Sequence, residues 1–165
     1  VYERSDSDLR GLEGLAPTTG WLHGEASEAP LAIEENGVRL AVDIAGSVFT
    51  DHFKNGCRVT PSRTLVEGLG DEEIISCPEW ERLDDMVQAT DRDAILAARE
   101  LARSEAIFAG GSSGATLWGV RQLAARLTAA GTDSGARIAT LFADSGNRYL
   151  STIYSDAWIA RQGWS

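Results

Sequence analysis

The sequence of 165 residues is poor in the side chains that build disulfide frameworks and metal sites. Its two cysteines, Cys57 and Cys77, lie too far apart for a Cys-x-x-Cys motif, and no cluster of acids or cysteines surrounds His23 or His52. Because a zinc site needs three or four ligands, we expect no metal site. The few cysteines and the absence of a visible secretory signal indicate a reducing, cytoplasmic setting.

Long apolar runs and an excess of basic residues are also missing. No apolar stretch approaches the roughly 20 residues that a membrane-crossing helix needs. The 25 acidic residues outnumber the 15 basic ones, and the formal net charge of -10 repels phosphate backbones. Neither a membrane nor a nucleic acid is therefore an expected partner. The 43% of apolar residues suits one globular domain with a single core.

Two regions of the chain differ in composition. Residues 1–36 carry several glycines, Pro17, Pro30 and many acids, and they show no sustained period, although residues 25–35 could hold a short helix. We expect this N-terminal segment to be irregular. Residues 37–165 have regular apolar patterns and are assigned to a single folded region.

In the second region, strand patterns alternate with helix patterns. Thr90 is a favourable N-cap for one helix, and Gly131 is a favourable C-terminal stop for the next. A long loop is expected over residues 55–80. This alternation predicts an α/β fold with a mainly parallel, twisted sheet and helices on both faces. The predicted strands are 38–43, 85–89, 106–109 and 137–143, and the predicted helices are 91–105, 115–130 and 155–163.

A glycine and serine turn follows the third predicted strand. It reads Gly110-Gly111-Ser112-Ser113-Gly114. In an α/β sheet, ligands bind past the carboxyl ends of strands, where small residues and free helix N–H groups let a flat ligand approach the backbone. The same pattern also suits a tight turn with a serine cap and no ligand, so the residues alone leave both interpretations open.

The residues around this turn match a family. The segment 101–115, which ends in Gly-Gly-Ser-Ser-Gly-Ala, resembles the corresponding segment of fold-type II pyridoxal-phosphate enzymes. Residues 144–151 resemble the family's Asp-Ser-Gly-x-x-Tyr-Leu-Ser/Thr run. Residues 155–164 resemble the closing helix of cystathionine β-synthases.

Two upstream segments extend the resemblance. Asp43 with Gly46-Ser47-Val48 is similar to the family's Asp-Pro-Glu-Gly-Ser stretch, with Ile44-Ala45 in place of Pro-Glu. Residues 66–70 are similar to its Val-Glu-Gly-Ile-Gly loop. Five segments in the family's order thus cover residues 38–165, and they resemble the C-terminal half of cystathionine β-synthase and cysteine synthase-like enzymes.

The resemblance implies pyridoxal phosphate as the cofactor and gives roles to individual residues. Ser112 corresponds to the serine that shares a hydrogen bond with the pyridine nitrogen, and the glycines of the turn would give the ring room. The residues near the pyridine ring would be Gly110, Gly111, Ser112, Gly114, Asp144 and Ser145. The loop on the substrate side would contain Glu67, Gly68 and Gly70.

Simpler roles remain open for some of these residues. Glu67 also reads as an ordinary solvated acid, because acidic side chains are mostly exposed. Asp144 and Ser145 could equally form a capping turn. In the family, a Gly-Thr-Gly-Gly-Thr loop holds the phosphate, and a gapless count places only a degenerate version of it here, at Thr18, Thr19 and Gly20.

The sequence has no match to the lysine that bonds the cofactor covalently as a Schiff base. Its single lysine, Lys54, stands in an unrelated setting and is expected to be a surface charge, so no catalytic residue is assigned. One hypothesis is therefore the C-terminal portion or subunit of a β-replacement enzyme that acts on serine or an O-activated serine. The alternative is a non-catalytic scaffold, or pseudoenzyme, that binds a partner protein.

Both hypotheses predict an oligomer. Half of a larger sheet would expose apolar edges that need cover, so we expect a homo- or hetero-oligomer. For the enzyme hypothesis, the partner would be a chain that carries the N-terminal half of the fold and supplies the lysine.

Overall fold

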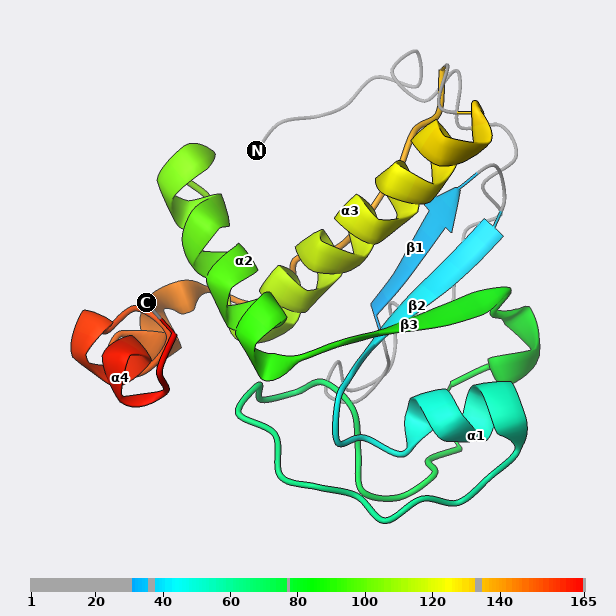
Figure 1. Ribbon diagram of the computed structural model, residues 1–165, viewed down its shortest axis with the longest axis horizontal. Helices are drawn as coiled ribbons and strands as arrows, with labels where there is room; N and C mark the ends of the chain where they lie inside the picture. The colour runs from blue at the N-terminus through cyan, green and yellow to red at the C-terminus, as the bar shows by residue number, and fades with distance from the viewer. Residues whose placement is uncertain (1–30, 36–37, 77, 133–134, 165) are drawn as a thin grey trace, which may run out of the picture.

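The computed structural model describes residues 31–35, 38–76, 78–132 and 135–164. They form a three-stranded sheet with helices around it (Figure 1). The strands are β1 (Leu31–Glu35), β2 (Val38–Ile44) and β3 (Asp85–Ala89). The helices are α1 (Phe49–Asn55), η3 (Trp80–Arg82), α2 (Asp91–Ser104), α3 (Gly111–Ala130), η4 (Gly146–Tyr149) and α4 (Asp156–Arg161), where η marks a 3-10 helix.

Strand β2 lies at the centre of the sheet. It pairs antiparallel with β1 and parallel with β3, where Leu40 lies opposite Asp85 and Ile44 lies opposite Ala89. Because β2 and β3 run in the same direction, their carboxyl ends meet at one edge of the sheet.

The expected strands at β2 and β3 and the α/β class are confirmed. The short helix considered within residues 25–35 is wrong for 31–35, which pair with β2 as a strand. The rest of the N-terminal segment 1–36 lies outside the described residues.

Helices cover both faces of the sheet, because alternate residues of β2 point to opposite sides. On one side Val42 packs in a buried cluster with Ile95 of α2 and Leu123 of α3. On the other side Ala41 packs with Phe49 of α1. Figure 1 shows α1 and α3 on opposite sides of the strands.

Helices α2 and α3 have the termini that the sequence predicts. Thr90 caps α2 in a capping box, in which its side chain accepts from the Asp93 N–H and the Asp93 carboxylate accepts from the Thr90 N–H. Helix α3 ends at Gly131 in the left-handed region. The two helices approach closely at Gly114, where an added Cβ would lie 2.0 Å from the carbonyl oxygen of Ala94.

Helix α3 begins four residues earlier than predicted. Gly110 is its N-cap with an extended backbone, and Gly111 is its first residue rather than Ala115. The glycine and serine residues therefore form the first helical turn. The N–H groups at its start point out of the helix without an intrahelical acceptor, and the Gly114 N–H is the first to donate within the turn, to the Gly110 carbonyl oxygen.

The predicted strands over 106–109 and 137–143 are wrong for the described part of the chain. Neither segment forms a strand among the described residues, although an isolated antiparallel bridge joins Ala109 to Ser145 and Ala139 is a single bridge residue in the segment 137–143. A strand requires a neighbouring segment that completes its hydrogen bonds, and the apolar pattern alone cannot supply one.

The end of the chain agrees with the prediction. Ser155 caps α4, and its side chain accepts a hydrogen bond from the Trp158 N–H. Among the helices of the described ranges, none is both long enough and apolar enough to cross a membrane.

Candidate functional site

The loop over residues 62–72 forms one wall of the candidate site. It is held by Asp91, the first residue of α2, whose Oδ1 accepts from the N–H groups of Leu65 at 2.9 Å and Val66 at 3.3 Å. The sequence had assigned Asp91 only to the first turn of a helix. The structure shows that its carboxylate also fixes a loop that lies about 25 residues before it in the sequence.

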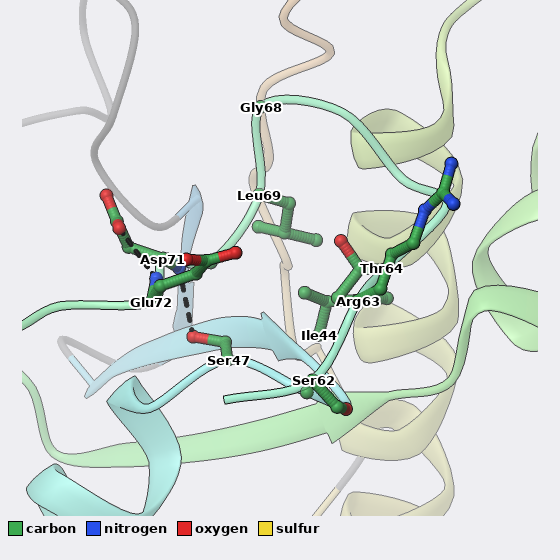
Figure 2. A pocket seen from close by; sticks show the side chains of 11 residues that line it. Ile44, Ser47, Ser62, Arg63, Thr64, Gly68, Leu69, Asp71 and Glu72 are labelled. Carbon is green, nitrogen blue, oxygen red and sulfur yellow. Dashed lines mark hydrogen bonds between the residues drawn. The ribbon is translucent and has the colours of Figure 1, made fainter. Parts of the chain in front are cut away.

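A pocket of about 380 Å³ lies between this loop and the end of β2. Figure 2 shows Ser47 at its base, where its Oγ accepts from the Asp71 N–H at 3.2 Å. The lining is mostly polar and carries charges of both signs. Its polar side chains are Ser47, Ser62, Arg63, Thr64, Asp71 and Glu72.

Two residues predicted for the substrate-side loop, Gly68 and Gly70, line this pocket. Both have positive φ, at 73° and 75°, which favours glycine. At Gly70 an added Cβ would also lie 2.5 Å from the Cβ of Ser47, so the loop could not keep its path with another residue.

On the other side of the site, Asp144 closes over the start of α3. A Cβ added to Gly110 would lie only 2.1 Å from Oδ1 of Asp144, so the carboxylate fills the space beside this glycine. Its Oδ2 accepts from the Tyr149 hydroxyl at 2.7 Å. Oδ1 is buried and has no hydrogen-bond partner among the described residues.

Tyr149 is held as a neutral donor. Burial raises the pKa of its hydroxyl to about 12, and the hydrogen bond and charge of Asp144 act in the same direction. The charge of Glu67 adds to this increase, so the substrate-side loop and the residues at the start of α3 share one electrostatic environment.

Ser112 lies in the first turn of α3 and is 7% exposed. Its hydroxyl makes no hydrogen bond within the part of the chain that the structure describes. Ser113 beside it is fully buried, and its Oγ also lacks a partner. Ser112 does not line the pocket at the end of β2.

Gly111 and Val66 connect the two parts of the site. An added Cβ on Gly111 would lie 3.3 Å from Cγ1 of Val66 and 3.1 Å from Cδ1 of Ile153. The structure thus brings together the predicted loop over 67–70, the first turn of α3 and Asp144.

Other predicted site residues lie elsewhere or have simpler roles. Gly114 faces α2, where the lack of a side chain makes room for helix packing, and its role beside a ring stays a prediction. Ser145 forms the capping turn that was the alternative, since its hydroxyl accepts from the Asn147 N–H. Thr18, Thr19 and Gly20 lie outside the described residues.

The single lysine is remote from this site. Lys54 ends α1 and pairs with Asp85 at 3.5 Å, with 41% of its side chain exposed. Asp85 begins β3, whereas the site lies past the carboxyl ends of the parallel strands. The expectation of a surface charge is confirmed. Within the described ranges, no three His, Cys, Asp or Glu side chains are grouped to hold a metal ion.

Sequence reasoning missed two residues of the site. Tyr149 appeared only as part of a matching run, and nothing in its spacing indicated that the hydroxyl points back to Asp144. Arg63 supplies the positive charge in the pocket lining. It lies in a loop whose sequence has no regular pattern, so nothing indicated its position.

Comparisons with known proteins agree with this geometry. Residues 30–144 match the model of a family described as pyridoxal-phosphate dependent enzyme. Two N-(2-amino-2-carboxyethyl)-L-glutamate synthases are similar to the chain over 145 residues, or 87% of its length. The one from Ralstonia nicotianae is 38% identical, and the one from Cupriavidus metallidurans is 34% identical. The match spans 39% of the length of each relative and corresponds to its C-terminal part.

Proposed function

Because the chain belongs to the family of pyridoxal-phosphate dependent enzymes, we propose that it forms the part of a synthase that holds the pyridine ring of the cofactor. The observation that carries the proposal is the free hydroxyl of Ser112 in the first turn of α3. It lies in the same turn as Gly111, against which the substrate-side loop packs.

The residues at the start of α3 fit the pyridine side of this cofactor. A buried polar atom without a hydrogen bond costs free energy, and the described residues contain two such atoms at the start of α3: Asp144 Oδ1, which lies against Gly110, and Oγ of Ser113. A ligand that brings polar atoms here would lower that cost. Ser112 would hold the pyridine nitrogen, and Gly110 and Gly111 would leave room beside the ring.

When bound, pyridoxal phosphate supplies an electron sink for bond cleavage at Cβ of an amino acid, and a neutral serine partner keeps that sink mild. The protein's contribution is to orient the ring and to exclude water. The wall formed by Val66 and Ile153 excludes water from one side of Gly111.

The pocket at the end of β2 suits an amino-acid substrate. Arg63 would attract a carboxylate, and the Ser62 hydroxyl beside it can donate a hydrogen bond. The Thr64 hydroxyl donates to the Val66 carbonyl oxygen and can still accept a hydrogen bond from a substrate. Gly68 and Gly70 keep the loop backbone close to the bound molecule. Glu67 would repel a second carboxylate from the side nearest Tyr149.

The proposed reaction is β-replacement. The names of the two relatives describe a 2-amino-2-carboxyethyl group on L-glutamate. That group has the carbon skeleton of serine without its hydroxyl, so replacement at Cβ of serine or of an O-activated serine would supply it. We propose an amino-acid amine as the nucleophile. The lysine that bonds the cofactor would come from another segment, because Lys54 lies at the other end of the sheet.

The alternative is a non-catalytic scaffold that binds a partner protein. The position of Lys54 favours it, since the chain alone has no lysine near Ser112. The two functions differ in one property: the enzyme part must retain pyridoxal phosphate when the fold is completed, and the scaffold need not.

The test is cofactor retention by a completed fold. The full chain is co-expressed with the N-terminal part of the Ralstonia synthase, purified as a complex and saturated with pyridoxal phosphate. We expect visible absorbance that survives dialysis. Ser112→Ala should weaken retention by about fivefold to tenfold, the effect of one hydrogen bond.

Ser104→Ala is the matched control. The Ser104 hydroxyl donates to the Glu100 carbonyl oxygen on the exposed end of α2, so its loss should leave retention unchanged. A complex that forms without retaining the cofactor would support the scaffold and contradict the proposal. If Ser112→Ala and Ser104→Ala changed cofactor retention equally, Ser112 would not hold the cofactor.

A further inference from the structure

Asp91 holds the loop over residues 62–72 from outside it. Its Oδ1 accepts from the N–H groups of Leu65 at 2.9 Å and Val66 at 3.3 Å, across 26 and 25 positions of the sequence. Figure 1 shows the loop after α1 passing beside the start of α2, where Asp91 is the first residue. Hydrogen bonds to a carboxylate are charge-assisted and about twice as strong as those between neutral groups. The contact is therefore a strong one for a loop of this kind.

The start of α2 does not need this carboxylate for its own cap. In the capping box, Thr90 Oγ1 accepts from the Asp93 N–H, and Asp93 Oδ2 accepts from the Thr90 N–H, both at 3.2 Å. Two acids in one helical turn therefore have different partners, because Asp93 serves the helix and Asp91 serves the loop. The helix macrodipole favours an acid at either position, so it does not explain the contact of Asp91 with the loop backbone.

The two ends of the loop are tied to the end of β2 instead. The Ser62 N–H donates to the Gly46 carbonyl oxygen at 2.9 Å, and the Asp71 N–H donates to Ser47 Oγ at 3.2 Å. These bonds fix where the loop starts and where it returns. Asp91 acts between them, on the part of the loop that is farthest from β2 along the chain.

The backbone that Asp91 holds lies in the middle of the pocket lining. Residues 62–64 come before the held pair and residues 68–72 come after it, and both groups line the pocket at the end of β2. Asp91 itself does not line the pocket. Any effect of its carboxylate on a bound molecule must therefore pass through the loop.

Helix α2 is in turn fixed against the first turn of α3. At Gly114 an added Cβ would lie 2.0 Å from the Ala94 carbonyl oxygen and 2.8 Å from the Ala98 Cβ, so the two helices touch without space for a side chain. In the same turn, an added Cβ on Gly111 would lie 3.3 Å from Cγ1 of Val66. A loop anchored to the first residue of α2 is thereby held in register with the turn that carries Ser112.

We propose that Asp91 is a positioning residue for the amino-acid substrate. Its carboxylate holds the loop backbone so that the pocket keeps the shape in which Arg63 and the backbone around Gly68 can meet the substrate. This inference rests on the proposed function, because it names a residue that acts on the substrate pocket of that function. Since Asp91 contacts the loop and not the start of α3, it should govern substrate affinity more than cofactor retention.

The first test measures the loop by hydrogen exchange in the full chain, without cofactor or partner. In Asp91→Ala the Leu65 and Val66 amides lose their acceptor and should exchange at least about tenfold faster. Asp91→Asn keeps an acceptor oxygen without the charge, so these amides should exchange no more than about threefold faster. The amides of β3 report overall stability, and the loop rates are compared with theirs.

Asp93→Ala is the matched control. It removes a carboxylate from the same helical turn, also partly buried, and it breaks the capping box. The variant should destabilise α2 at least as much as Asp91→Ala does. The exchange of the Leu65 and Val66 amides relative to β3 should nevertheless match the wild type. Equal acceleration in Asp91→Ala and Asp93→Ala would mean that Asp91 acts only through the stability of α2, and it would overturn the proposal.

The second test measures substrate affinity in the completed enzyme. The chain is co-expressed with the N-terminal part of the Ralstonia synthase, loaded with pyridoxal phosphate and assayed with O-acetyl-L-serine or O-phospho-L-serine as donor and L-glutamate as amine. Asp91→Ala should raise the KM of at least one of these amino acids about tenfold and change kcat less than about threefold. Asp91→Asn should restore most of the affinity. Cofactor retention should change less than in Ser112→Ala.

The outcomes separate this inference from the proposed function. A complex that retains no cofactor contradicts the proposed function, and the exchange comparison alone then supports or overturns the positioning of the loop by Asp91. Unchanged exchange at Leu65 and Val66 in Asp91→Ala overturns the inference even if the complex retains the cofactor. Faster exchange together with an unchanged KM in an active complex also overturns it, because the loop would then be held without any effect on the substrate.

Discussion

The Tyr149 hydroxyl donates to Oδ2 of Asp144 over 2.7 Å, and the other carboxylate oxygen lies against the backbone of Gly110. This hydrogen bond fixes the position of the carboxylate at the start of α3. It also adds to the increase in the pKa of Tyr149, because a phenolate could not donate to Asp144 and would be repelled by its charge.

The raised pKa of Tyr149 gives a prediction for alkaline pH. The pKa is about 12 in the folded chain and near the ordinary 10.0 when unfolded. The folded state therefore holds the proton more tightly, and this contribution to the free energy of unfolding is complete below pH 10. It is lost as the pH rises toward 12. Tyr149→Phe should remove this part of the pH dependence, as measured by denaturant unfolding across that range.

Absorbance of the tyrosinate band gives an independent measurement of the same group. The wild-type chain should show a tyrosine that titrates near pH 12, and Tyr149→Phe should lack that step. Burial also raises the pKa of Tyr154, whose hydroxyl donates to the Ala109 carbonyl oxygen, so Tyr154→Phe is the comparison and should keep the step near pH 12. An unchanged step near pH 12 in Tyr149→Phe would show that Asp144 does not hold the phenol.

Two glycines in the first turn of α3 should respond differently to alanine. At Gly114 a Cβ would meet the Ala94 carbonyl oxygen at 2.0 Å, so Gly114→Ala must separate α2 from α3. At Gly111 the nearest atom is 3.1 Å away, at the end of the Ile153 side chain, which can move. We expect Gly114→Ala to cost about 3 kcal/mol or more and Gly111→Ala about 1 kcal/mol or less. Thermal and denaturant unfolding would measure both, and the reverse order would contradict this packing.

Ala106 should be more stable as glycine. It follows the C-cap of α2 and has a φ of 56°, a left-handed conformation that glycine adopts without steric cost. Ala106→Gly should raise the free energy of unfolding by about 1 kcal/mol. Ala125→Gly, at an exposed position inside α3, should lower it by a similar ~1 kcal/mol. Two changes of the same sign in denaturant unfolding would argue against a strained Ala106.

The N-cap of α2 offers a further test of local stability. Thr90→Ala removes the side chain that accepts from the Asp93 N–H and should cost about 1 kcal/mol. Thr60→Ala, in an exposed loop, should stay within about 0.5 kcal/mol of the wild type. Unfolding in urea would compare them, and equal losses would mean that Thr90 does not act as a cap.

Local signals in the sequence predicted the local structure well. The N-cap at Thr90, the stop at Gly131 and the start of the last helix at residue 155 each depend on a few neighbouring residues, and each is confirmed. Strands β2 and β3 are apolar because both faces of the sheet are covered, which leaves a clear pattern.

Features that depend on distant partners were not predictable in this way. Helix α1 depends on Asp43, whose Oδ2 accepts from both the N–H and the hydroxyl of Thr50, and no sequence period indicated it. The segments 106–109 and 137–143 carry strand patterns but form no strand among the described residues. Their patterns describe a larger sheet than the one formed here.

The candidate site shows the same division. The resemblance assigned the loop over 66–70 and the turn at the start of α3 to one site, because its matches extend over several segments, and the structure places Val66 of that loop against Gly111. The contact between Tyr149 and Asp144 depends on the path of η4, which follows from packing rather than from spacing.

The close approach of Asp144 to Gly110 couples two positions that are 34 apart along the chain. Gly110 has an ordinary φ of -81°, so its backbone would accept any residue. The neighbouring carboxylate and the ring of Tyr149, whose Cε2 would lie 2.7 Å from an added Cβ, prevent a side chain there. In an aligned set of sequences of this fold, these sites should therefore co-vary: alanine in place of Gly110 should occur with smaller residues in place of Asp144 and Tyr149.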